Sequence, residues 1–177
     1  DLFLLDAGAE SQFHYAGDLS STMPVAAKFA SRQRDIYDIA LAAHDAAADA
    51  LRPGVNHLDV HLLSCRMLVE GLKGIGLMKG DPAEAVKAGA HALFFPCGVG
   101  HMMGLDVHDM EDLGEVYVGY EGRPKFPQFG LKSLRLARPH MPGFVVTIEP
   151  GIYFIPQLID LWKAEKKHAD FIVYDKV

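Results

Sequence analysis

Two histidines and two acids lie in one glycine-bearing stretch, residues 96–109, which is otherwise largely apolar. Glycine lets the backbone approach a ligand closely, and imidazole is both the commonest metal ligand and a proton carrier near neutral pH. His101 and His108 are therefore candidate functional side chains, whereas Asp106 and Asp109 are expected to cap or orient a turn. The alternative is a glycine-bearing strand and turn with two hydrogen-bonded histidines, and this stretch alone does not separate the two interpretations.

Three carboxylates elsewhere occupy the ends of strand-like runs. Asp6 closes one apolar run, Asp18 begins a second run, and Glu149 closes a third. Buried carboxylates in one place repel one another unless a cation neutralises them. Combined with His101, they would form an oxygen-rich site with one imidazole, a ligand set that suits Mn²⁺, Co²⁺, Fe²⁺ or Zn²⁺. Taken singly, each acid is equally typical of a turn or a strand edge.

A hairpin or meander over residues 1–25 is expected to place the first two acids on neighbouring strands. Residues 2–5 form a short apolar run typical of a buried strand, and the polar residues 10–14 predict a turn. Residues 144–148 are rich in β-branched and aromatic side chains and predict a third strand, which Glu149 follows.

Helices are predicted between these strands. Apolar residues at helical spacing predict one helix over residues 31–51, with Ser31 as its cap, and a second helix capped by Asn56. A short helix over 82–88 would begin after Asp81.

The segment after the histidine stretch has a different character. Residues 111–142 combine glycine, proline and aromatic residues, which is typical of a long binding loop. Residues 156–170 are expected to form a helical or irregular insert around Trp162.

Composition excludes several classes of function. The 177 residues carry a net charge of −6 and no basic stripe, which argues against nucleic acid as a partner. No apolar run is long enough to span a bilayer, so no membrane partner is expected. Two cysteines, Cys65 and Cys97, are too few for a disulfide framework, and a reducing, cytoplasmic location is predicted. The chain begins and ends at strand-like residues, so it is interpreted as a fragment of a longer protein.

Four ordered motifs together resemble the pita-bread metallopeptidases, the creatinase/aminopeptidase family. They occupy residues 5–10, 16–24, 101–109 and 147–153, and within the family they are most similar to X-Pro aminopeptidases and prolidases. The resemblance runs from residue 1 to about residue 154. It implies an α+β fold class, in which curved antiparallel sheets are covered by helices on the outside and the domain is incomplete at both ends.

The resemblance also implies a dinuclear metal site. Its ligands would be Asp6, Asp18, His101 and Glu149, four of the family's five ligand positions. Two divalent ions are expected, Mn²⁺ first, with Co²⁺, Zn²⁺ or Fe²⁺ as alternatives. His108 and Glu149 would be catalytic, His108 beside the scissile bond and Glu149 as a proton acceptor.

Three departures from the family pattern accompany this resemblance. The spacing from Asp6 to Asp18 is one residue longer than expected, and the turn at 10–14 is the place to absorb it. Cys97 stands where many relatives have a histidine. The fifth ligand, a glutamate, is expected beyond Val177. Residues 1–177 are therefore interpreted as a partial catalytic domain, and weak or absent catalysis is expected of the piece alone.

The predicted activity is removal of the N-terminal residue from peptides with proline in the second position, by a water activated between two metals. A prolidase-type X-Pro dipeptidase and a methionine aminopeptidase are the enzymatic alternatives, and an inactive pita-bread protein-binding module is the other. The proline ring is expected to lie against Phe or Tyr residues of the loop 111–142. A homodimer is also anticipated by the resemblance.

Overall fold

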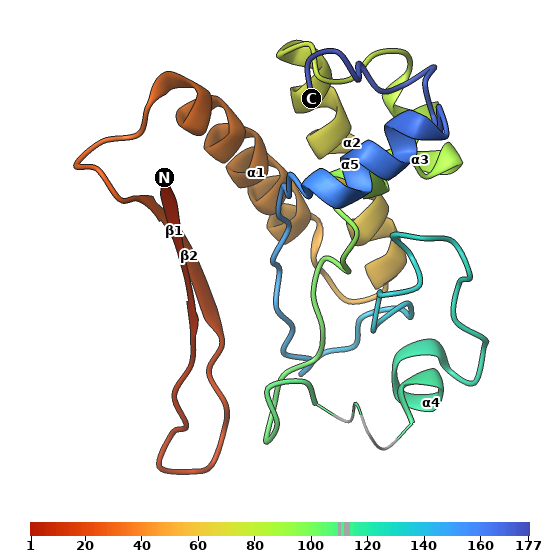
Figure 1. Cartoon of the computed structure of the whole chain (residues 1–177). Coiled ribbons are helices and arrows are strands. Elements are labelled where there is room, and N and C mark those ends of the chain that lie inside the picture. Colours follow the sequence, from red (N-terminus) through yellow and green to blue (C-terminus); the bar gives the residue numbers. More distant parts are fainter. Residues whose placement is uncertain (110, 112–113) are drawn as a thin grey trace.

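The computed structural model describes residues 1–109, 111 and 114–177, and it contains a two-stranded ribbon beside a group of helices (Figure 1). The strands and helices follow in the order β1 (Leu2–Ala7), β2 (Leu19–Pro24), α1 (Ser31–Ala50), α2 (His57–Gly74), α3 (Pro82–Ala88), the 3₁₀ helix η1 (Ala90–Leu93), α4 (Glu115–Tyr120) and α5 (Pro156–Ala164). In the part of the chain described, no helix is both long and apolar enough to cross a membrane.

The predicted hairpin is confirmed as an antiparallel pair of β1 and β2. Asp6 lies opposite Ser20, and an isolated bridge joins Glu10 to Ala16 in the same register. Because the register is unbroken up to that bridge, a residue in excess of the spacing expected for the family would lie in the turn over residues 11–15. Asp18 directly precedes β2 and lies on the same face of the ribbon as Asp6, because side chains alternate between faces along each strand.

The prediction that residues 2–5 form a buried strand is wrong. Leu2 and Leu4 are 43% and 57% exposed, and every residue of β1 is exposed. The ribbon stands beside the helices rather than under them (Figure 1). Among the described residues β1 pairs only with β2, so no further layer covers its apolar side chains.

Helices α1 and α2 pack against each other and form the centre of the main core (Figure 1). Asn56 caps α2 as predicted, because its side chain accepts a hydrogen bond from the Leu58 backbone at 3.0 Å. The predicted N-cap of α1 is wrong by one residue. Ala30 is the N-cap and Ser31 the first helical residue, and the Gln33 side chain accepts the Ala30 N–H at 2.9 Å instead.

The shorter helices extend this core. Asp81 caps α3 by accepting the Glu84 N–H at 3.0 Å, as predicted. The expected insert around Trp162 contains α5, and Trp162 is 3% exposed within the main core.

Two extended segments far apart in the sequence run side by side and carry site residues. The amides of Thr147 and Glu149 donate to the carbonyls of His101 and Val99 at 2.9 and 2.7 Å. A β-carbon on Gly100 would lie 1.9 Å from the Thr147 carbonyl oxygen, so only glycine permits this approach. The predicted strand at 144–148 is nevertheless wrong as a regular strand. Its segment forms one isolated bridge, because the described hydrogen bonds are too few for a continuous ladder.

Candidate metal site

Three of the predicted ligand residues converge on one point. The His101 Nε2 atom lies 3.2 Å from Asp18 Oδ2 and 3.1 Å from Glu149 Oε1. One ligand atom from each of the three lies within 4.8 Å of the other two. The ribbon supplies Asp18, and the paired extended segments supply His101 and Glu149, so residues from three distant stretches meet in one group.

Hydrogen bonds fix the orientation of His101. Its Nδ1 lies 2.9 Å from the Met102 carbonyl oxygen, which can only accept, so Nδ1 carries a proton there. Nε2 is thereby directed toward the carboxylates and is the nitrogen free to bind a cation. The backbone amide of His101 also donates to Thr147 Oγ1 at 3.0 Å.

Thr147 supports the site in a way that sequence reasoning missed. Its hydroxyl donates to Glu149 Oε1 at 2.7 Å while accepting the His101 amide. Thr147 therefore fixes the position of the Glu149 carboxylate relative to His101. A signal was available in the sequence, because a residue two positions before Glu149 on an extended segment shares its face.

The electrostatics of the group favour a cation. Burial lowers the pKa of His101, but hydrogen bonds to Glu149 and Met102 and the charges of Glu149 and Asp18 outweigh it and raise that pKa. Burial raises the pKa of Glu149, but hydrogen bonds from His101 and Thr147 outweigh it and lower that pKa. Positive charge between these side chains is therefore stabilised, whether a proton or a metal ion supplies it.

Asp6 lines the same cavity but stands outside the close group of three. This cavity has a volume of about 560 Å³ and also includes Asp18, His101, His108 and Glu149 in its wall. A β-carbon on Gly8 would lie 1.8 Å from the Gly17 carbonyl oxygen, so the two strands approach closely at this end of the ribbon. Asp6 and Asp18 are therefore held on one wall of one cavity.

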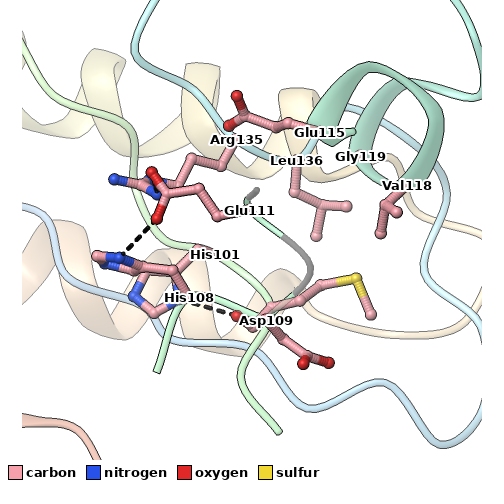
Figure 2. Close-up of a pocket in the computed structure, with 10 residues that line it drawn as sticks. His101, His108, Asp109, Glu111, Glu115, Val118, Gly119, Arg135 and Leu136 are labelled. Carbon is pink, nitrogen blue, oxygen red and sulfur yellow. Dashed lines mark hydrogen bonds and ion pairs between the residues drawn. The ribbon is translucent and has the colours of Figure 1, made fainter. Parts of the chain in front are cut away.

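His108 contacts the ring of His101, because the chain turns back on itself over residues 103–109. The two ring centroids are 4.3 Å apart and the rings are nearly perpendicular. His108 Nδ1 also lies 3.0 Å from Glu111 Oε2, and both residues are drawn in Figure 2. Asp109, expected to be structural, packs its carboxylate against Gly104.

A smaller pocket of about 20 Å³ adjoins the main cavity at His101 and His108 (Figure 2). Glu111 and Arg135 form an ion pair in its wall. Sequence reasoning missed Arg135, because an arginine inside a long irregular loop carries no periodic signal.

The expected aromatic pocket is not supported. None of the described Phe or Tyr residues of segment 111–142 lines either cavity, and the apolar wall of the smaller pocket comes from Met102, Val118 and Leu136. Tyr120 is 1% exposed and belongs to a second core with Leu134. Residues 110, 112 and 113 lie outside the described residues.

Cys97 is exposed and lies near the carboxylate of the site. Burial of its thiol and the charge of Glu149 both raise its pKa, so the protonated thiol is favoured. Tyr153 shares these surroundings, because burial and the negative charges of Glu149 and Asp6 raise its pKa. Tyr153 therefore belongs to the edge of the site, although its role was not predicted.

The donor set fits a divalent metal ion. Two carboxylate oxygens and one imidazole nitrogen match the preference of Mn²⁺, Co²⁺, Fe²⁺ and Zn²⁺ for mixed oxygen and nitrogen ligands. The second nitrogen of His101 is held by a backbone carbonyl, the arrangement that typically orients a metal-binding imidazole.

Comparisons with known sequences identify one family. The description of metallopeptidase family M24 matches residues 1–171. Human Xaa-Pro dipeptidase is 38% identical over 173 residues, which cover 97% of this chain and 34% of the human protein. A probable Xaa-Pro aminopeptidase of Botryotinia fuckeliana is 38% identical over 173 residues, covering 97% of this chain and 36% of that protein. The chain thus spans about a third of the length of these curated relatives.

Solved structures of Escherichia coli aminopeptidase P have a similar fold. One histidine-to-alanine variant matches with a TM-score of 0.72 and 39% identity, covering 88% of this chain and 31% of that chain. The zinc-substituted form in complex with product matches with the same TM-score and identity, covering 89% and 31%. This likeness confirms the fold class that the four motifs predicted.

Proposed function

This chain belongs to metallopeptidase family M24, and on that premise we propose that it is part of a metal-dependent aminopeptidase. The substrates would be peptides with proline in the second position, from which the N-terminal residue is released. The convergence of Asp18, His101 and Glu149 within 4.8 Å carries the proposal. The names of the relatives, Xaa-Pro aminopeptidase and Xaa-Pro dipeptidase, support the substrate class.

The proposed ligands are four side chains on the wall of the main cavity: Asp6, Asp18, His101 and Glu149. We propose two divalent ions, with Mn²⁺ before Co²⁺, Zn²⁺ or Fe²⁺, and a further glutamate ligand beyond Val177. The ions would supply Lewis acidity toward the scissile carbonyl and would make a water molecule more acidic.

The side chains of this chain would then have separate tasks. Glu149, whose lowered pKa keeps it ionised, would accept the proton of the attacking water. His108 lies beside His101 at the junction of the two cavities, where it would stabilise charge on the carbonyl oxygen. Thr147 would hold the Glu149 carboxylate in place relative to His101 during the reaction.

The proposal is tested with the intact protein, Mn²⁺ and an X-Pro tripeptide. His101→Ala is expected to abolish turnover and weaken Mn²⁺ binding, whereas His44→Ala, at an exposed histidine of α1, leaves both unchanged. Unchanged turnover in His101→Ala would refute the mechanism. Equal turnover of a methionine-alanine peptide would favour a methionine aminopeptidase instead, and lack of Mn²⁺ binding in the unmodified protein would favour the non-catalytic module.

A dipeptidase is the second candidate, and Arg135 is the observation that favours it. Its guanidinium lies in the pocket that adjoins the cavity at His108, and guanidinium groups bind carboxylates in a bidentate manner. A dipeptide places its free carboxylate close to the scissile bond, and Arg135, which is paired with Glu111, would exchange that partner for it. Arg135→Gln should then raise KM for an X-Pro dipeptide and change KM for a longer peptide little. Equal effects on both substrates would favour the aminopeptidase.

We further propose a homodimer in the cytoplasm. Two cysteines are too few for a disulfide framework, which is typical of proteins of a reducing compartment. Light scattering of the intact protein would test the dimer, and fractionation of the source cells would test the compartment.

A further inference from the structure

A second group of metal-binding side chains lies in the interior, apart from the carboxylate site. His61 and Cys65 are one turn apart on α2, and His91 lies on η1. The His61 Nε2 atom is 3.4 Å from Cys65 Sγ, and one ligand atom from each of the three lies within 4.8 Å of the other two. All three residues are at most 1% exposed.

The polar atoms of this group lack the partners that buried groups normally have. Among the described residues, His61 Nδ1 has no hydrogen-bond partner, and the His91 ring has the Val86 carbonyl beside it but no hydrogen bond of normal geometry. Leaving such a buried group unsatisfied costs about 1–3 kcal/mol, so native proteins contain few of them. Two neighbouring histidines that are fully buried with unsatisfied nitrogens therefore require an explanation other than packing.

Both imidazoles are held in the form that binds metals. Burial, with smaller contributions from neighbouring histidines, lowers the pKa of His61 to about 3. Burial likewise lowers the pKa of His91 to about 4, although the Val86 carbonyl acts in the opposite direction. Both rings are therefore neutral at physiological pH, with a nitrogen lone pair available for coordination.

We propose that His61, Cys65 and His91 form a closed binding site for one thiophilic metal ion, Cu⁺ in preference to Zn²⁺. A thiolate ligand selects such soft ions over Mn²⁺ or Mg²⁺. Ligands about 2.0–2.3 Å from a common ion are separated by roughly 3.3–4 Å, and the 3.4 Å separation of His61 and Cys65 falls in this range.

Charge and ligand number favour Cu⁺. One thiolate and Cu⁺ together are neutral, whereas one thiolate and Zn²⁺ leave a net positive charge in a dry core, which is costly. Structural Zn²⁺ sites are almost always four-coordinate, and the group found among the described residues has three members.

Binding is coupled to release of a proton. Burial raises the pKa of the Cys65 thiol, so the S–H bond is intact without an ion. As the bond between Sγ and the metal forms, the S–H bond breaks and its proton leaves to solvent. The bound ion would join α2 to η1, which precedes the segment that carries His101. It would bind His61 through Nε2 and would give one of the two His91 nitrogens a partner.

The test measures Cu⁺ retained by the intact protein under anaerobic conditions. The protein is purified from cells grown with added copper salt and challenged with the chromophoric Cu⁺ chelator bicinchoninate. His101→Ala is the background for every variant, so that the carboxylate site contributes no imidazole. About one Cu⁺ per chain should resist the chelator in this background and in Cys97→Ala. It should be lost in Cys65→Ala.

A matched zinc preparation identifies the ion, since Zn²⁺ retained in place of Cu⁺ would overturn the preference for copper. X-ray absorption of copper-loaded protein with Cys65 intact guards against a folding defect in Cys65→Ala. One sulfur and two imidazole nitrogens are expected around copper. A copper shell without sulfur, retention that depends on Cys97, or no retained metal would overturn the site.

Discussion

Thr147 shows how much of the carboxylate site depends on a side chain that binds no metal. Its hydroxyl joins the backbone of His101 to the carboxylate of Glu149. Such supporting partners are typically worth 10–100-fold in metal affinity.

Thr147→Val is therefore expected to weaken binding of Mn²⁺ about 10-fold or more, while the melting temperature changes little. Isothermal titration of the intact protein measures the affinity. Thr22→Val, on β2 and outside the site, is the matched control and should leave the affinity unchanged. An unaltered affinity in Thr147→Val would show that backbone pairing alone positions the ligands.

At the level of single residues, three of the four side chains predicted to share a site lie together, while their binding of metal stays a prediction. His101, Asp18 and Glu149 were recognisable because each stands in a distinctive local motif. Thr147, Arg135 and the His61–Cys65–His91 group were not predicted, since their significance arises from neighbours that are distant in the sequence. Helical spacing marked the face of α2 as core and gave no sign that a histidine of η1 would meet it.

Among the structural elements, the pairing of residues 99–103 with 145–149 determines whether His101 and Glu149 can meet. Gly100→Ala places a β-carbon 1.9 Å from the Thr147 carbonyl oxygen and must separate the segments. A loss of about 1–3 kcal/mol in the free energy of unfolding is expected, together with weaker Mn²⁺ binding. Urea unfolding and metal titration measure the two effects.

Gly74→Ala is the control for that substitution, because a β-carbon there meets nothing within 4 Å. It should leave both quantities close to those of the unmodified protein. Similar losses in the two variants would indicate that Gly100 matters through chain flexibility rather than through close approach.

Helix α2 makes the metal-free protein sensitive to acid. Its buried His57 and His61 have pKa values lowered from 6.5 to about 4 and about 3. Below pH 6.5 these histidines bind protons in the unfolded chain but remain neutral in the folded chain. Their contribution to the free energy of unfolding is therefore complete above pH 6.5 and declines as the pH falls toward 4. Each such histidine contributes about 1.4 kcal/mol per pH unit.

Denaturant unfolding from pH 7.5 to 4.5 tests this dependence. The slope of the free energy of unfolding against pH measures the protons taken up on unfolding. His61→Gln should reduce that number by about one proton, whereas His44→Gln, at an exposed position, should not. A flat profile in the unmodified protein would mean that water reaches these histidines in the folded state.

The sequence predicted the order of elements better than their burial or regularity. The hairpin, both long helices and α3 were predicted with nearly correct bounds, because caps and helical periodicity are local signals. The predicted strand at 144–148 and the burial of residues 2–5 were wrong. Both depend on which other segments lie alongside, and no local pattern specifies that.

For the molecule as a whole, the ribbon presents an apolar surface. Phe3 and Leu4 are 50% and 57% exposed on a strand with one partner, and such strands associate readily. The 177-residue chain should therefore self-associate as its concentration rises. Phe3→Lys with Leu4→Ser should reduce the apparent mass in light scattering without lowering the melting temperature of the helical part.

Tyr117→Ser, which removes a side chain that is 75% exposed on α4, is the control and should not change the apparent mass. Association that persists in the ribbon variant would place the contact elsewhere on the molecule.

The ribbon is connected to the helical part through few polar contacts near its turn. The Ala16 amide donates to the Gly104 carbonyl at 2.9 Å, and Asp18 contacts His101. A ribbon held in this way opens at a free-energy cost set by those contacts, well below that of global unfolding. An ion shared between Asp18 and His101 would raise that cost. The β1 and β2 amides would then exchange with deuterium more slowly, and their exchange rate would measure how much of the metal site is occupied. The hairpin would thereby report on metal binding through its own dynamics, without any measurement of catalysis.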